Sequence, residues 1–198
     1  MNNTLENYLQ THPKKYLIFD LDSTLARLKI DWTTFRRDIF DLVAIFDKQL
    51  TEEVPFVPFA GLELANRAIK LHGEHAKNTI NSFVERYELT HYSGYTPNPE
   101  LLSFIRSQKE KYKLYIWTSN MRKTIMEFLK NELLESSFSK IVCREDVTFL
   151  KPEIEGFKQI QIGGSNPNEY LMIGDNFTDE GAAKNAGIDF FIIDYFSH

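Results

Sequence analysis

Five short apolar runs divide the chain, and each is nearly continuous rather than alternating with polar residues. They cover residues 16–19, 114–117, 141–143, 170–173 and 190–193. Continuous runs of this length are typical of strands that are buried on both faces of a parallel sheet. The pattern therefore predicts five strands that pack side by side in the interior of the protein.

Helical periodicity fills the intervals between the later runs. The predicted helices cover residues 100–111, 121–134, 153–162 and 178–186. Pro99 and Pro152 lie close to the starts of the first and third helices, and Gly187 follows the last one, as expected for helix termini. Strands that alternate with helices favour right-handed crossovers. The predicted fold class is therefore α/β, with a Rossmann-like, doubly wound parallel sheet.

The stretch from residue 26 to residue 95 interrupts this alternation, because roughly 70 residues without a convincing strand are too many for an ordinary crossover. Asp31 is placed to cap a helix whose apolar positions recur every three or four residues up to Leu50. After the proline-rich segment VPFVPFAG, apolar stripes indicate a second helix around Leu62–Ile69 and a third around Ala76–Tyr87. The sequence therefore predicts a helical cap domain, 26–95, inserted into an α/β core made of 1–25 and 96–198.

Composition and charge exclude several classes of function. The 198 residues are 42% hydrophobic and carry a net charge of −5, which gives no basic footprint for nucleic acid or for a membrane surface. No apolar stretch approaches the ~20 residues of a membrane span, and the N-terminus lacks the pattern of a signal peptide. Cys143, the single cysteine, is interpreted as a core residue rather than a nucleophile. We expect a cytoplasmic protein, either a monomer or a small homo-oligomer.

Polar residues follow four of the predicted strands. They are Asp20 and Asp22 in IFDLDSTL, the triplet Thr118, Ser119 and Asn120, then Lys151, and finally Asp175 and Asp179. Each of these is also an acceptable turn or loop residue when it is considered alone. Because parallel strands end at a common edge, however, the fold brings all four groups together where α/β proteins bind ligands.

Such a cluster has a definite chemistry. Several carboxylates in one cleft repel one another unless a cation lies among them, and hard oxygen ligands suit Mg²⁺. Lys151 supplies a positive charge, and Thr118 lies ahead of a helix N-terminus that can bind an anion. A carboxylate nucleophile, a second carboxylate, a divalent cation and anion-binding donors together predict a site for phosphoryl transfer.

The order of these motifs resembles that of the haloacid dehalogenase (HAD) superfamily of hydrolases. DLDST at 20–24 is similar to its nucleophile motif, and IWTSN at 116–120 to its second motif. KPEIEGF at 151–157 resembles the lysine motif, and IGDNFTDEGAAKNAGI at 173–188 the acidic fourth motif. The predicted cap also lies where subfamily I of the superfamily carries a helical cap.

The resemblance implies a role for each acidic residue. Asp20 would attack phosphorus and become an aspartyl phosphate, and Asp22 would act as the general acid and then the general base. Mg²⁺ would be held by Asp20, by the backbone carbonyl of Asp22 and by Asp175, with Asp179 supporting it through water. Magnesium is the one cofactor that the resemblance implies.

The same resemblance implies a set of phosphate contacts. Thr118 and Lys151 would bind the transferring phosphoryl group, and Leu21, Ser119 and Asn120 would add further contacts.

Two positions depart from the family pattern. Ser23 stands where the family usually has glycine, and Asn176, itself a further candidate contact, stands where many relatives have serine. Neither change removes a reacting group.

The expected function is Mg²⁺-dependent phosphatase activity on a small phosphorylated metabolite, specifically a phosphomonoester. A phosphomutase of the β-phosphoglucomutase type and a non-catalytic binding protein remain as alternatives. Asp22 argues against a dehalogenase, because a halide leaving group needs no acid. Six basic residues of the predicted cap either lie on a solvated face, the favoured interpretation, or bind a distal anion of the substrate: Arg27, Lys29, Arg36, Arg37, His72 and His75.

Overall fold

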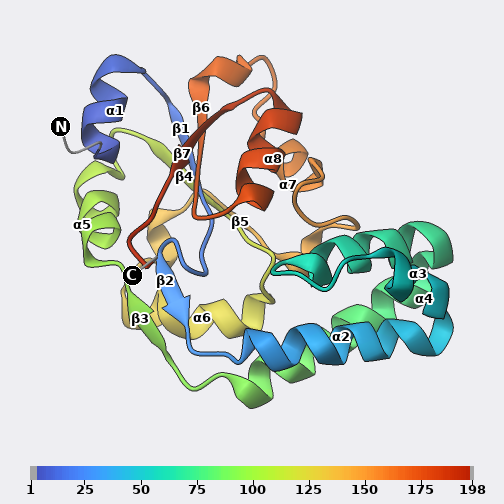
Figure 1. Cartoon of the computed structure of the whole chain (residues 1–198). Helices are drawn as coiled ribbons and strands as arrows, with labels where there is room; N and C mark the ends of the chain where they lie inside the picture. Colours follow the sequence, from blue (N-terminus) through green and yellow to red (C-terminus); the bar gives the residue numbers. More distant parts are fainter. Residues whose placement is uncertain (1–3, 197–198) are drawn as a thin grey trace.

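The structure is a computed structural model that describes residues 4–196 (Figure 1). Five parallel strands form the central sheet in the order β5-β4-β1-β6-β7. Their bounds are Lys140–Val142 for β5, Lys113–Trp117 for β4, Tyr16–Phe19 for β1, Tyr170–Gly174 for β6 and Asp189–Ile192 for β7. All five predicted strands are present to within one residue, and the predicted α/β, Rossmann-like fold class is confirmed. β1 lies in the centre, where Phe19 pairs with Ile116 on one side and Ile173 on the other.

Helices cover both faces of this sheet. On one face, α1 (Leu5–Thr11), α5 (Pro99–Gln108) and α6 (Arg122–Asn131) share an apolar cluster with alternate residues of the central strands. On the other face, α7 (Glu155–Ile160) and α8 (Phe177–Ala186) do the same (Figure 1). Short 3₁₀ turns at Glu135–Ser137, Arg144–Asp146 and Pro167–Glu169 complete the connections. Cys143 lies in the first cluster without exposed surface, and burial raises the pKa of its thiol to about 12, as expected of a core residue.

The inserted region is helical, with one difference from the prediction. It contains α2 (Trp32–Phe46), α3 (Lys48–Glu53) and α4 (Ala60–His91), and α4 is kinked at Gly73, between the second and third predicted helices. Asp31 caps α2 by accepting the N–H groups of Thr33 and Thr34 at 3.0 Å each. The expectation that this region holds no strand was wrong, because β2 (Ala26–Leu28) begins it.

β2 pairs in antiparallel fashion with β3 (Tyr95–Pro97), so the two connections between the helical insert and the sheet are joined to each other. Figure 1 shows helices α2–α4 grouped on one side of the molecule, beyond this ribbon. Buried residues of α2 and α4 belong to the same apolar cluster as the sheet face that α7 and α8 cover. The exact division into core and cap at residues 25 and 96 stays a prediction. Within residues 4–196, no helix combines the length and the apolar character needed to cross a membrane.

Candidate active site

Asp20 lies at the carboxyl end of β1, directly against Lys151. The Asp20 N–H donates to the carbonyl of Ile173 at 2.9 Å, which fixes the residue at the end of the sheet. The Lys151 Nζ donates to Asp20 Oδ1 at 2.6 Å and to Asp179 Oδ1 at 2.5 Å. All three side chains are buried. The fold therefore brings together an acid from the first motif, the lysine of the third and an acid of the fourth.

Burial and charge act in opposite directions on this group. Burial raises the pKa of Asp20 well above its usual range, while the ammonium of Lys151 opposes that shift. Burial alone would lower the pKa of Lys151, but Asp179 and Asp20 outweigh it and hold the pKa above its ordinary value. Lys151 therefore stays protonated, and its positive charge offsets the electrostatic cost of burying the carboxylates of Asp20 and Asp179.

A cluster of oxygen ligands lies at the same place. Carboxylate oxygens of Asp20, Asp175 and Asp179 all lie within 4.8 Å of one another. Asp179 Oδ2 is buried without a hydrogen-bond partner. The missing side chain of Gly174 makes room for it, since a Cβ there would lie 2.4 Å from Asp179 Oδ2. An orphaned carboxylate oxygen among hard oxygen donors is what Mg²⁺ requires, so these residues fit the implied cation.

Asp22 lies apart from that cluster, and only its backbone carbonyl enters the predicted set of metal ligands. Its side chain is partly buried and lines the cavity described below. Its Oδ1 accepts the N–H of Leu28 in β2 at 2.8 Å. Burial is the main reason that the pKa of Asp22 rises to about 7. At neutral pH such a carboxyl can both donate and accept a proton, which is the property that a general acid and base needs.

The predicted phosphate contacts follow β4. The Thr118 hydroxyl is buried and donates to Asn120 Oδ1 at 2.9 Å. Ser119 and Asn120 line the cavity, and Ser119 Oγ is buried without a partner. The side chain of Leu21 packs fully in the core, so only its backbone is left to contact a phosphate. No observation tests the roles predicted for these residues, and they stay predictions.

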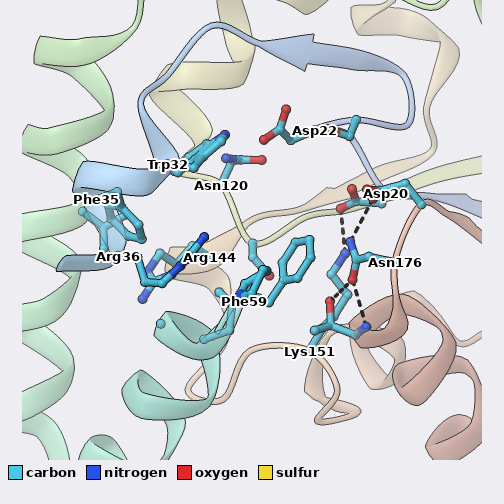
Figure 2. A pocket seen from close by; sticks show the side chains of 18 of the residues that line it. Asp20, Asp22, Trp32, Phe35, Arg36, Phe59, Asn120, Arg144, Lys151 and Asn176 are labelled. Atoms are coloured by element: carbon cyan, nitrogen blue, oxygen red, sulfur yellow. Dashed lines mark hydrogen bonds and ion pairs between the residues drawn. The ribbon is translucent and has the colours of Figure 1, made fainter. Parts of the chain in front are cut away.

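A cavity of about 230 Å³ lies between the helical insert and the sheet edge, and Asp20, Asp22 and Lys151 are among its lining residues (Figure 2). This volume is below the usual range for ligand pockets and suits a small substrate. Trp32, Phe35 and Phe59 of the insert form an aromatic part of its wall.

Among the six basic residues of the predicted cap, Arg36 alone lines this cavity within the part of the chain that the structure describes. Arg27 instead stacks on the ring of Phe196 at 4.9 Å, and His72 contacts Asp47 at 2.7 Å.

Two buried charged residues of this cavity were not predicted. Glu88 of α4 is 1% exposed and accepts the N–H of Met121 at 3.0 Å and the Asn120 side-chain amide at 3.4 Å. Arg144 is 2% exposed and follows β5. Since Arg144 comes directly after the third predicted strand, the rule that selected the other strand ends would have found it. Glu88 has no such signal, because it is one glutamate among several on an amphipathic helix.

The fold and the site define an α/β protein with a lysine-linked carboxylate cluster at the carboxyl edge of a parallel sheet, under a helical insert. Comparison with protein families matches residues 17–193 to the haloacid dehalogenase-like hydrolases. The chain belongs to this family.

Similar proteins include a pyrophosphatase, PpaX from Listeria welshimeri, which is 31% identical over 174 residues, covering 86% of this chain and 78% of the relative. Among solved structures, a HAD phosphatase from Thermococcus onnurineus superposes with a TM-score of 0.57 at 22% identity, covering 93% of this chain and 88% of that one. The HAD-hydrolase YfnB from Bacillus subtilis, whose structure contains magnesium, gives a TM-score of 0.54 at 20% identity, covering 91% and 87%. These structural likenesses establish the fold.

Proposed function

We propose that the protein is a Mg²⁺-dependent phosphatase that hydrolyses a small phosphomonoester through an aspartyl phosphate on Asp20. The observation that carries this proposal is the pairing of Asp20 with Lys151 at 2.6 Å, beside a cavity that Asp22 also lines. The similarity to a pyrophosphatase and the magnesium in a structural relative support a phosphatase-type reaction and its cation.

Two proton-coupled displacements account for the chemistry. Lys151 holds Oδ1 of Asp20, which leaves Oδ2 to attack phosphorus while the bond to the leaving oxygen breaks. Asp22 gives its proton to that oxygen. In the second step Asp22 takes a proton from water, the water oxygen attacks phosphorus, and the Asp20 carboxylate is restored as phosphate leaves. Magnesium held by Asp20, Asp175 and the Asp22 carbonyl, with Asp179 in support, would offset negative charge on the phosphoryl group.

A second candidate substrate is inorganic pyrophosphate, which the printed name of the 31% identical relative favours. The same residues would serve, because a phosphate leaving group also needs a proton from Asp22. A phosphomutase would use the same two acids. It would be recognised by conversion of a sugar monophosphate into its isomer, in the presence of a bisphosphate activator, rather than by release of free phosphate.

The test is phosphate release from p-nitrophenyl phosphate and from pyrophosphate, with Mg²⁺ and with EDTA. We expect Asp20→Asn to lower kcat by at least about 10³-fold, because the nucleophile is lost. Asp189→Asn is the matched control. It also removes one carboxylate, but Asp189 lies at the start of the edge strand β7, where it pairs with Lys14, and does not line the cavity. If the wild-type protein releases no phosphate from a broad panel and binds no fluoride-based phosphate mimic, the protein is a non-catalytic binding protein instead.

A further inference from the structure

Arg144 is a buried cation at the edge of the cavity, and it forms no ion pair with any residue of the described range 4–196. It opens the 3₁₀ turn Arg144–Asp146 that follows β5, and its backbone N–H donates to the carbonyl of Asn120 at 3.0 Å. Its position after β5 and this hydrogen bond place it at the same sheet edge as Asp20 and Lys151. It comes from the core of the protein, whereas the six basic residues that the sequence offered for a distal anion all belong to the predicted cap, 26–95.

The hydrogen bonds of its guanidinium are incomplete. Nε donates to Asn81 Oδ1 of α4 at 3.0 Å, and Nη2 is buried with no partner among the described residues. Leaving a buried donor unpaired is costly, and more so when the group is charged. Asn81 therefore acts as a positioning residue that holds one side of the guanidinium, while the other side lacks an acceptor.

Glu88 does not supply that acceptor. It lies near enough for Arg144 to influence its pKa, but no ion pair joins the two within residues 4–196. Its carboxylate is used instead by the backbone N–H of Met121 and by the amide of Asn120. Glu88 and Glu145 act on the charge of Arg144 from a distance, but the buried Nη2 donor is left for an acceptor outside the described residues.

The surroundings of Arg144 indicate what that group is. Figure 2 shows Arg144 next to Arg36 of the insert, with Trp32 and Asn120 nearby, on the opposite side of the cavity from Lys151. Lys151 is already placed to face a phosphoryl group, so Lys151 marks one end of this small cavity, and Arg144, with Arg36 beside it, marks the other. A planar guanidinium matches the paired oxygens of a carboxylate or a phosphate.

We propose that Arg144 binds a second anionic group on the leaving-group side of the substrate. This inference rests on the proposed phosphatase function and narrows its substrate class. The preferred substrates are short phosphate esters or anhydrides in which a carboxylate or a second phosphate lies a few bonds from the reacting phosphorus. The aromatic wall leaves little room for a bulky group between the two anions.

The experiment compares ethyl phosphate with 2-phosphoglycolate, in which a carboxylate replaces the methyl group, and adds pyrophosphate as the phosphate arm. We expect the wild-type protein to prefer the charged compounds by at least tenfold in kcat/KM. Arg144→Met, which keeps the length of the side chain and removes its charge, should abolish most of that preference. Arg106→Met is the matched control, because Arg106 pairs with Glu132 away from the cavity and should leave the ratio unchanged.

Calorimetric titration of the inactive Asp20→Asn variant with the same three compounds gives a readout that does not need turnover. If no compound is hydrolysed but the charged ones bind at least tenfold more tightly, and Arg144→Met removes the difference, the phosphatase proposal fails and the anion site stands. If the wild-type protein shows no preference in either assay, or if Arg144→Met keeps it, the role given to Arg144 is wrong. A preference for pyrophosphate alone identifies the second anion as a phosphate, and one for 2-phosphoglycolate alone identifies it as a carboxylate.

Discussion

Ser23 adopts a backbone conformation that its side chain disfavours. It stands in the turn between Asp22 and the ribbon, where its N–H donates to the carbonyl of Ala26 at 2.7 Å, and its φ is +64°. Left-handed backbone conformations cost a non-glycine residue on the order of 1 kcal/mol. The departure from the usual glycine of the family therefore has a physical cost, although Asp20 and Asp22, which precede it, keep their places at the site.

We predict that Ser23→Gly raises the free energy of unfolding by up to about 1 kcal/mol, because glycine adopts this φ without strain. Chemical denaturation measures the change. Ser137→Gly is the control, since Ser137 lies in a 3₁₀ turn outside the left-handed region. That variant should lose roughly 0.5–1 kcal/mol through the greater freedom of glycine in the unfolded chain. Equal losses in both variants would contradict the assignment of strain to Ser23.

At the same scale, sequence and structure agree best where a residue follows a buried strand. Asp20, Lys151 and Asp179 meet as the strand-end argument predicts, because parallel strands leave no other arrangement for their carboxyl ends. Arg144 also directly follows a predicted strand, but it belongs to none of the motifs from which the site residues were predicted. Glu88 could not be predicted from the sequence, since its burial depends on how α4 packs against another part of the chain.

Helices and strands with a local sequence pattern were predicted, whereas elements that depend on long-range pairing were not. The continuous apolar runs predict the positions of the five strands to within one residue. The positive φ of Gly73 separates the two halves of α4 at the place where the apolar periodicity changes. β2 and β3 have three residues each, and β3 includes Pro97, so neither carries a readable strand pattern. Their pairing is a long-range contact that local patterning does not encode.

Helix α6 depends on α4 for its N-terminus. Met121, the residue before the helix, provides no side-chain cap, and Glu88 accepts its N–H at 3.0 Å instead. Glu145 accepts the next N–H, that of Arg122, at 3.1 Å. A carboxylate at a helix N-terminus is favourable, but full burial opposes its charge. Burial accordingly raises the pKa of Glu88 from 4.5 to about 7, against the opposing effect of the hydrogen bonds that Glu88 itself accepts, that from Met121 among them, and of Arg144.

This shift predicts a pH-dependent effect of Glu88→Gln. Between pH 4.5 and about 7 the folded protein keeps a proton on Glu88 that the unfolded chain has released. The contribution of Glu88 to stability therefore falls as pH rises through that window and stays low above it. Glutamine does not titrate, so the unfolding free energy of the variant should rise relative to wild type by roughly 3 kcal/mol across the window.

Denaturation of both proteins at several pH values between 4 and 8 measures this difference. Glu127→Gln on the exposed side of α6 corrects for the loss of one carboxylate from the net charge. A difference between wild type and Glu88→Gln that does not change with pH would show that the pKa of Glu88 is the same in the folded protein as in the unfolded chain.

At the scale of the whole molecule, α4 connects the helical insert to three points in the loops that follow β4 and β5. Asn66 exchanges two hydrogen bonds with the backbone of Leu150, Asn81 binds Arg144, and Glu88 binds Met121. Asp22 adds a fourth connection through the N–H of Leu28 in the ribbon. Each of these bonds ends beside a residue of the candidate site. Movement of the insert would therefore disturb the residues next to Lys151, Arg144 and Asn120 together.

Asn66 tests whether this coupling matters, because Leu150 immediately precedes Lys151. Asn66→Ala removes bonds of 2.8 and 2.9 Å to the Leu150 N–H and carbonyl and leaves both groups partly buried, so we expect a loss of about 1–3 kcal/mol in stability. The backbone amides of residues 147–151 should exchange hydrogen faster, and kcat/KM for the best substrate should fall because Lys151 is no longer held in place.

Asn185→Ala is the matched control. Asn185 donates one exposed hydrogen bond of 3.0 Å to the carbonyl of Pro152 on the same loop, but it belongs to the core helix α8. If both variants speed exchange and lower kcat/KM equally, the loop responds to any lost hydrogen bond. If only Asn66→Ala does so, the position of Lys151 depends on the docked position of α4.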